Sequence, residues 1–211
     1  SFPEKKMSTR KGNIILMEEL LDEAEDRAYK IVCEKNPDLA EAKKREVARQ
    51  VGIGAVKYAI LAQNRLTDII FTWDKILSLE GNSAPYLQYV YARGRSILRK
   101  SPAYASLGGA GKILPQGGTK YVFKEPQELA VARLLPKFPE IVALAAEEFK
   151  PNLIANYLFE LASRFNGFYA GLPVLQAEEG IAKARLKLVE AVTVVLRNGL
   201  DLFGIEVPEE M

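Results

Sequence analysis

Helical spacing of apolar residues is the feature that most constrains the fold of this chain. In the first such segment, apolar residues recur at intervals of three and four, while acidic residues occupy the opposite side. This spacing places an apolar stripe along an amphipathic α-helix. Asn36-Pro37 predicts the end of the helix, because proline does not continue one. The apolar positions are Met17, Leu20, Leu21, Ala24, Ala28, Ile31 and Val32.

The same signals predict further helices along the chain. Residues 41–61 form the second, and the mostly apolar stretch 51–61 should be buried on most sides. A connector over 64–73 is expected to be extended, followed by a short helical turn near 75–79. Prolines near their starts mark four of the later helices, since a helix's first turn accepts proline, and apolar spacing that ends at Gly204 marks the last one. We expect these helices over residues 83–100, 126–135, 139–149, 151–169 and 178–203.

Strand signals are too few for a sheet, so the predicted fold class is all-α, a helical bundle. Residues 101–124 contain Ser-Leu-Gly-Gly-Ala-Gly-Lys and Pro-Gln-Gly-Gly-Thr-Lys, with neither helix nor strand period. This stretch is therefore expected to be a mobile loop.

Several aromatic residues have a spacing that fits helix packing and have no basic cluster beside them. The lone cysteine likewise fits a packed helix. We expect a structural role for Trp73, Tyr157, Phe159, Phe165, Phe168 and Cys33.

Composition excludes several classes of site. The 211 residues include no histidine, which excludes Ser-His-Asp and Cys-His catalysis and the usual imidazole metal sites. One cysteine allows no intramolecular disulfide, which favours a reducing, cytoplasmic setting. No apolar run is long enough for a membrane span, so no membrane partner is expected. Because the chain starts at Ser1, without an initiator Met or a signal peptide, we expect it to be a piece of a longer protein.

The basic stretch Lys-Lys-Met-Ser-Thr-Arg-Lys-Gly-Asn over residues 5–13 has two possible interpretations. Flexible ammonium groups beside a Gly-Asn turn can follow the phosphates of a nucleotide as charge develops. A basic tail rich in Ser and Thr can also be only a solvated segment. Read alone, the stretch does not decide between a phosphate-binding loop and a tail.

Several motifs in register resemble the arginyl-tRNA synthetases, a family of class I aminoacyl-tRNA synthetases. Residues 6–12 resemble the Lys-Met-Ser-Lys-Ser loop of that class, although Thr9 stands where the second lysine is expected. The resemblance covers the whole chain apart from the Gly-rich loop. It is carried by Val-Gly-Ile-Gly-Ala-Val-Lys-Tyr (51–58), Phe-Thr-Trp-Asp-Lys (71–75), Pro-Tyr-Leu-Gln-Tyr-Val-Tyr-Ala-Arg (85–93), Ala-Asn-Tyr-Leu-Phe-Glu-Leu (155–161) and Asn-Gly-Leu-Asp-Leu-Phe-Gly-Ile (198–205).

The resemblance implies a division of labour. Residues 1–74 would carry the catalytic loop and a helical connector, and residues 75–211 the helical anticodon-binding domain. Lys6, Ser8 and Lys11 would act on the ATP side, with Met7 and Gly12 beside them. The intact enzyme would use ATP with Mg²⁺ to join L-arginine to tRNA(Arg). An upstream half with a His-Ile-Gly-His motif is missing here, so we expect a monomer that binds no cofactor and catalyses nothing alone.

Tyrosines flanked by arginines suit single-stranded RNA, whose bases stack on aromatic rings while cations hold phosphates. Between Gly81 and Lys124 there is no acidic residue and there are seven basic ones. Tyr86, Tyr89 and Arg93 share one face of the helix expected over 83–100. The resemblance adds residues near the end of the 151–169 helix and at the C-terminus. The candidate tRNA-binding residues are Tyr86, Tyr89, Arg93, Arg95, Arg99, Tyr169 and Met211.

Other interpretations are compatible with the same residues. Tyr86 and Tyr89 can be core residues with satisfied hydroxyls, and Met211 can belong to a frayed end. The family could instead be a neighbouring class I synthetase, such as the cysteinyl or methionyl enzyme. The chain could also be a helical protein-interaction module with no RNA role, in which case the basic window would be a coincidence.

Overall fold

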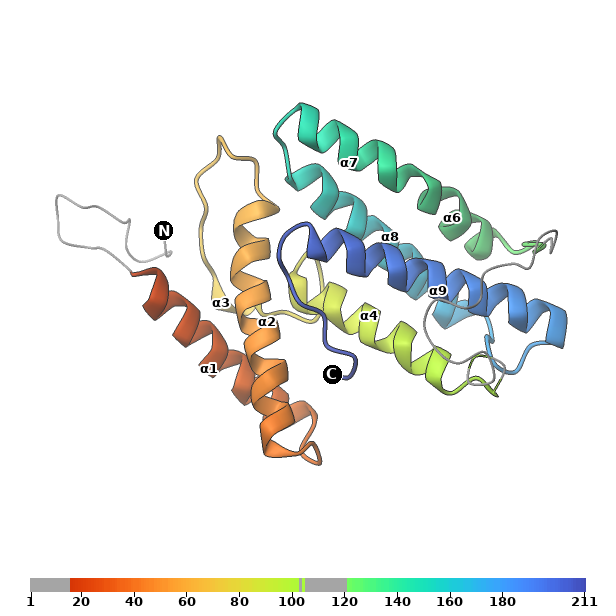
Figure 1. The fold of residues 1–211 in the computed structure, drawn as a ribbon, viewed down its shortest axis with the longest axis horizontal. Helices are drawn as coiled ribbons and strands as arrows, with labels where there is room; N and C mark the ends of the chain where they lie inside the picture. Colours follow the sequence, from red (N-terminus) through yellow and green to blue (C-terminus); the bar gives the residue numbers. More distant parts are fainter. Residues whose placement is uncertain (1–15, 103, 105–120) are drawn as a thin grey trace.

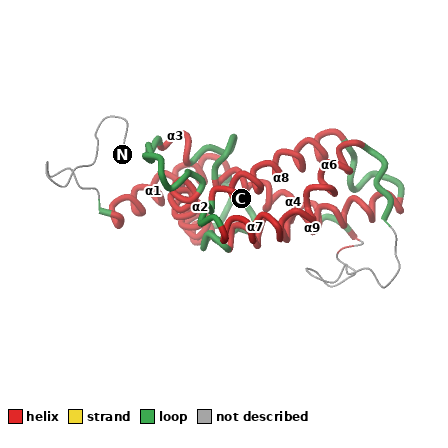
Figure 2. The backbone as a smooth tube through the Cα atoms, turned by 90° about the horizontal axis from the view of Figure 1, so that it is seen from above, coloured by secondary structure: helices red, strands yellow, loops and turns green. Residues whose placement is uncertain are grey.

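The computed structural model describes residues 16–102, 104 and 121–211, and within these ranges the only regular structure is helical. Two parts lie side by side along the molecule (Figure 1). At one end, α1 (Met17–Lys35) and α2 (Glu41–Leu61) form an antiparallel pair, with the short α3 (Trp73–Ile76) packed nearby. The rest is a helical bundle, which Figure 2 shows from above. It comprises α4 (Ala84–Arg99), α6 (Pro126–Leu134), α7 (Phe138–Glu147), α8 (Asn152–Gly171) and α9 (Glu179–Asp201). The predicted all-α bundle is confirmed.

The α1–α2 pair packs closely because α2 presents a glycine where the helices meet. A Cβ atom added to Gly52 would lie 2.7 Å from the backbone carbonyl carbon and oxygen of Ala24. Such contacts with backbone leave no room for a side chain. The second half of α2 is largely buried, as predicted, with Val51, Ala55 and Tyr58 almost fully shielded from solvent.

The bundle core lies between α4, α8 and α9. Tyr157, Phe165 and Phe168 of α8 are buried, which confirms their structural role. Helix α4 begins at Ser83, whose hydroxyl accepts a hydrogen bond from the backbone N–H of Tyr86. Pro85 sits in the first turn of α4, where its missing N–H costs nothing. Helix α4 buries its apolar residues in the bundle, and the adjacent face can contact other segments or a ligand.

Three details differ from the expectations. Residues 126–147 run almost without a break, because the 3₁₀ turn Leu135–Lys137 around Pro136 joins α6 directly to α7. The turn expected near 75–79 begins earlier, at Trp73, and ends at Ile76. Cys33 is only half-buried and lies beside Tyr29, so it is not a core residue. Most of the expected loop over 101–124 lies outside the described residues.

The C-terminal segment, residues 204–211, returns across the molecule between α2 and α4 (Figure 1). It leaves α9 through Gly204, whose φ of +62° is a conformation that glycine tolerates best. The buried Gln88 of α4 donates to the backbone oxygens of Gln50, at 3.0 Å, and of Glu206, at 2.7 Å. Arg49 of α2 pairs with the Glu206 carboxylate at 2.7 Å. These bonds direct the end of the chain toward the exposed face of α4.

Candidate nucleic-acid interface

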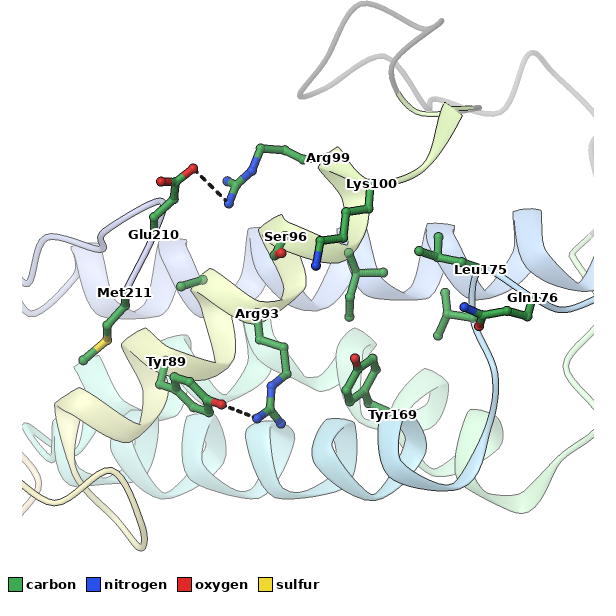
Figure 3. A pocket seen from close by; sticks show the side chains of 13 residues that line it. Tyr89, Arg93, Ser96, Arg99, Lys100, Tyr169, Leu175, Gln176, Glu210 and Met211 are labelled. Carbon is green, nitrogen blue, oxygen red and sulfur yellow. Dashed lines mark hydrogen bonds and ion pairs between the residues drawn. The ribbon is translucent and has the colours of Figure 1, made fainter. Parts of the chain in front are cut away.

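A pocket of about 710 Å³ lies between α4, the end of α8 and the C-terminal segment (Figure 3). We call it the aromatic pocket. It combines aromatic, cationic and small polar side chains with a few apolar ones. It is lined by Tyr89, Ala92, Arg93, Ser96, Ile97, Arg99, Lys100, Tyr169, Val174, Leu175, Gln176, Glu210 and Met211.

Arg93 occupies the middle of this pocket. Its guanidinium carbon lies 4.5 Å from the centre of the Tyr89 ring and 5.5 Å from the centre of the Tyr169 ring. It also donates hydrogen bonds to the hydroxyl of Tyr89 and, at 3.4 Å, to Oδ1 of Asn166. A guanidinium held between two aromatic rings gains cation–π attraction and is fixed in orientation. The site thus presents flat aromatic surfaces next to a positioned positive charge.

The local sequence explains the contact of Arg93 with Tyr89, and the tertiary fold explains its contact with Tyr169. Tyr89 and Arg93 are one helical turn apart on α4, so their side chains meet on one face. Tyr169 comes from the last turns of α8, and the packing of α4 against α8 brings it to the same place. Its side chain is 40% exposed, which leaves part of the ring open to a ligand.

Acidic residues of the C-terminal segment hold the two further arginines of α4. Nε of Arg95 lies 2.8 Å from Oε2 of Glu209, and Arg99 pairs with Glu209 and Glu210 at 3.5 Å. Arg99 lines the aromatic pocket, whereas Arg95 does not. Burial alone would raise the pKa of Glu209, but hydrogen bonds from Arg95 and Tyr91 and the charges of both arginines outweigh it. The Glu209 pKa therefore lies below its ordinary value.

Tyr86 is not among the residues that line the pocket. Its ring packs on Phe159, with the ring centres 5.7 Å apart, and its hydroxyl accepts a hydrogen bond from Nδ2 of Asn166 at 2.9 Å. Asn166 also contacts Arg93, so Tyr86 lies one residue behind the pocket and braces it. Burial raises the pKa of Tyr86, which keeps its hydroxyl protonated.

Met211 lies beside Tyr89 at the edge of the pocket (Figure 3). It is half-buried and packs against the hydrophobic cluster formed by α1 and α2. The tertiary structure thus brings together Tyr89, Arg93, Arg99, Tyr169 and Met211, five of the seven residues singled out for RNA binding. Arg95 and Tyr86 stand next to the pocket wall.

Several other lining residues were not among the candidate tRNA-binding residues. Ser96 and Lys100 follow Arg93 by three and seven positions on α4, so helical spacing could have indicated them. Leu175 and Gln176 belong to the connection between α8 and α9, which carries no periodic signal. Glu210 stands in a charged tail with nothing in the sequence to say where it folds.

The residues expected on the ATP side, Lys6, Met7, Ser8, Lys11 and Gly12, lie outside the described residues. Within the described ranges, no group of three or more Asp, Glu or Cys side chains is arranged to hold a metal ion. No described helix combines the length and apolarity needed to cross a bilayer.

Comparison with known families gives two matches. The model of the DALR anticodon binding domain matches residues 87–211, and that of the catalytic domain of class I tRNA synthetases (R) matches residues 3–73. The first match covers more than half of the chain and contains every residue that lines the aromatic pocket. The chain therefore belongs to the DALR anticodon binding domain family.

Individual proteins similar to this chain are arginine–tRNA ligases. The chain is 48% identical over 205 residues to the arginine–tRNA ligase of Fusobacterium nucleatum, covering 97% of this chain and 35% of that protein. It is 45% identical to the arginine–tRNA ligase of Pyrococcus abyssi, covering 99% of this chain and 33% of that protein. The arginyl-tRNA synthetase structure from Thermus thermophilus superposes with a TM-score of 0.85 at 38% identity, over 100% of this chain and 34% of that one. The chain spans about a third of the length of these relatives.

Proposed function

We propose that this chain is the part of an arginine–tRNA ligase that binds the anticodon of tRNA(Arg). The observation that carries the proposal is the guanidinium of Arg93 held between Tyr89 and Tyr169 at an open pocket. Unpaired anticodon bases need stacking surfaces and cations for the adjoining phosphates. Membership of an anticodon-binding family and close similarity to arginine–tRNA ligases support the same conclusion.

In this proposal the aromatic and basic residues of the pocket have defined tasks. A splayed base enters the pocket and stacks on the exposed ring of Tyr169 or Tyr89, where each stacked base contributes about 1–3 kcal/mol. Arg93, Arg99 and Lys100 supply positive charge to the phosphates on either side of that base. Met211 gives the pocket an apolar edge. Arg95 acts indirectly, because its bond to Glu209 anchors the segment that carries Met211.

The whole enzyme would join L-arginine to tRNA(Arg) with ATP and Mg²⁺, through a catalytic part of which residues 1–74 form the end. Lys6, Ser8 and Lys11, with Met7 and Gly12, would serve its ATP side. Residues 75–211 would form the anticodon-binding part, and the protein would act in the cytoplasm as a monomer. The chain contains no histidine and hence no His-Ile-Gly-His motif. We therefore expect the 211-residue chain alone to show no arginine-dependent ATP–pyrophosphate exchange.

Filter binding of the 211-residue chain to tRNA(Arg) and to tRNA transcripts for cysteine and methionine tests the proposal. We expect preference for tRNA(Arg), with affinity falling steeply as salt rises. Arg93→Ala should weaken binding roughly tenfold or more. Arg164→Ala removes an exposed arginine of α8 that pairs with Glu160, outside the aromatic pocket, and should change affinity little.

The alternatives predict different results in the same experiment. Preference for tRNA(Cys) or tRNA(Met) would assign the chain to a neighbouring synthetase. Binding that is absent, or unaffected by Arg93→Ala, would instead favour a helical protein-interaction module. Circular dichroism of each variant would show that loss of affinity does not result from unfolding.

A further inference from the structure

A second hollow, of about 480 Å³, adjoins the aromatic pocket. The two share three wall residues, Tyr89, Arg93 and Met211. The other walls come from outside the helical bundle: the end of α1 supplies one side and the connection between α3 and α4 supplies another. We call it the α1 hollow, and its remaining lining residues are Ile31, Val32, Lys35, Asn36, Leu79 and Glu80.

The α1 hollow has apolar walls and three polar side chains, an ammonium, a carboxylate and an amide. Ile31, Val32 and Leu79 provide the apolar surface. Lys35 and Glu80 are exposed, Asn36 is half-buried, and within the described residues none of these three side chains has a hydrogen bond or ion pair. Lys35 offers a cation, Glu80 an acceptor, and the Asn36 amide both a donor and an acceptor. A flat heterocycle with mixed donors and acceptors on its edge matches this set.

We infer that the α1 hollow binds a second unstacked base of the same single-stranded RNA, next in sequence to the base in the aromatic pocket. This inference rests on the proposed anticodon-binding function. Met211 and Tyr89 stand between the two hollows, so adjacent bases would lie on opposite sides of them. Consecutive nucleotides of a splayed strand can occupy neighbouring pockets in this manner, each with its own stacking surface.

Charge supports a nucleotide at this place. Arg93 faces both hollows, and within the described residues each of its terminal nitrogens donates to one partner, the Tyr89 hydroxyl for one and Asn166 for the other. Each terminal nitrogen of a guanidinium carries two N–H groups, so donors remain for a phosphate joining the two bases. Lys35, in the last turn of α1, adds a second cation on the far side. The Glu80 carboxylate accepts hydrogen bonds from a base amino group and repels a phosphate, which favours the base edge at that position.

Helix α1 thereby has a role in RNA binding. This helix belongs to the part of the chain matched by the catalytic-domain model, residues 3–73, whereas all residues lining the aromatic pocket lie in residues 87–211. The RNA surface would then span both parts, joined through Met211, which also packs on the α1–α2 cluster. Lys35 and Glu80 become binding residues, with phosphate and base as their respective ligands.

Binding of an RNA hairpin with the anticodon stem and loop of tRNA(Arg), measured by fluorescence anisotropy with the 211-residue chain, tests this inference. An abasic nucleotide is placed at each loop position in turn. Two neighbouring positions should each lose affinity roughly fivefold to a hundredfold with the unmodified protein. Lys35→Gln should lower affinity and reduce the slope of log affinity against log salt by about 1. Lys30→Gln, a change of another exposed lysine of α1, is the matched control and should leave the slope unchanged.

Glu80→Gln distinguishes recognition of a base from a general charge effect. Loss of its negative charge alone would strengthen binding of every hairpin equally. Recognition of a base edge predicts instead that preference among the four bases weakens at one of the two sensitive positions and stays intact at the other.

The results separate this inference from the function on which it rests. If Arg93→Ala weakens binding while only one loop position is sensitive, or while Lys35→Gln matches Lys30→Gln, the second subsite is wrong and the proposed function stands. If Arg93→Ala has no effect, the proposed function itself is wrong. Two adjacent sensitive positions together with a changed base preference in Glu80→Gln would support the inference.

Discussion

Arg93 and Tyr169 stand on different helices, yet the Arg93 guanidinium carbon lies 5.5 Å from the centre of the Tyr169 ring. Helix packing alone creates this pair, since the residues are far apart in the sequence. The contact leaves Tyr169 partly exposed and Arg93 half-buried. It therefore fixes the geometry of a pocket without filling it.

The first prediction concerns the ring of Tyr169. Tyr169→Ala should weaken binding of tRNA(Arg) by about 1–3 kcal/mol, because a stacked base loses its platform. Tyr169→Phe keeps the ring and should retain most of the affinity. Isothermal titration with both variants provides the measurement. Equal losses for Phe and Ala would show that the hydroxyl, and not the ring, binds the RNA.

The second prediction concerns two helical glycines with opposite surroundings. Gly52→Ala should destabilise the fold, because the new Cβ would meet the Ala24 backbone at 2.7 Å. Gly167, on the exposed side of α8, has no atom within 4 Å of an added Cβ. Gly167→Ala should therefore stabilise the fold by about 0.5–1 kcal/mol through higher helix propensity. Urea unfolding should move the two midpoints in opposite directions, and a shift in the same direction would contradict the packing of α1 on α2.

The third prediction concerns the buried ion pair between α6 and α9. Nε of Arg185 lies 2.6 Å from Oε1 of Glu128, and the side chains are only 8% and 4% exposed. Glu128 also accepts hydrogen bonds from the backbone N–H groups of Lys124 and Glu125. Arg185→Met leaves this carboxylate buried without a charge partner, so stability should fall by about 3–5 kcal/mol.

A matched variant makes the ion-pair prediction specific. Arg164→Met breaks an exposed pair with Glu160 on α8, where side chains are 55% and 52% exposed. Such a pair contributes at most about 1 kcal/mol. Chemical unfolding of both variants gives the comparison, and equal losses would mean that burial of the Arg185–Glu128 pair has no special weight.

The fourth prediction concerns pH. Burial opposes the charge on Glu209, but hydrogen bonds from Arg95 and Tyr91 prevail and hold its pKa below the ordinary glutamate value of 4.5. A pKa that is lower in the folded state stabilises the fold above the ordinary value, and this contribution disappears as pH falls through the lowered pKa. Glu209→Gln should therefore be less stable than the parent protein at neutral pH and approach it in acid. Urea unfolding at several pH values is the measurement, and a difference that does not change with pH would contradict the ion pair.

Local patterns were sufficient for most helices and for part of the site. The three and four residue spacing located α1, α2, α4, α8 and α9, because each helix buries one stripe whatever its partner is. The same rule placed Tyr89 and Arg93 on one face of α4. It was less successful at the junction of α6 and α7, where Pro136 suggested a break. A 3₁₀ turn accommodates this proline and continues the helical path.

Other features depended on contacts between distant segments. Tyr86 and Tyr89 carry the same chemistry three positions apart, but Asn166 and Phe159 cover Tyr86 while Tyr89 stays at the pocket. Arg95 and Arg99 look equivalent as basic residues of one helix. Both pair with acidic residues of the C-terminal segment, but only Arg99 lines the aromatic pocket.

Spacing and residue type alone were enough to establish an all-helical chain, the residues of each apolar stripe and the motifs shared with arginyl-tRNA synthetases. The tertiary structure decided which polar residues share a site. Tyr169, the α8–α9 connection and Met211 meet Arg93 only through helix packing and through the path of the C-terminal segment across α2 and α4. Such meetings depend on how the apolar stripes of different helices fit together, and no local pattern contains that information.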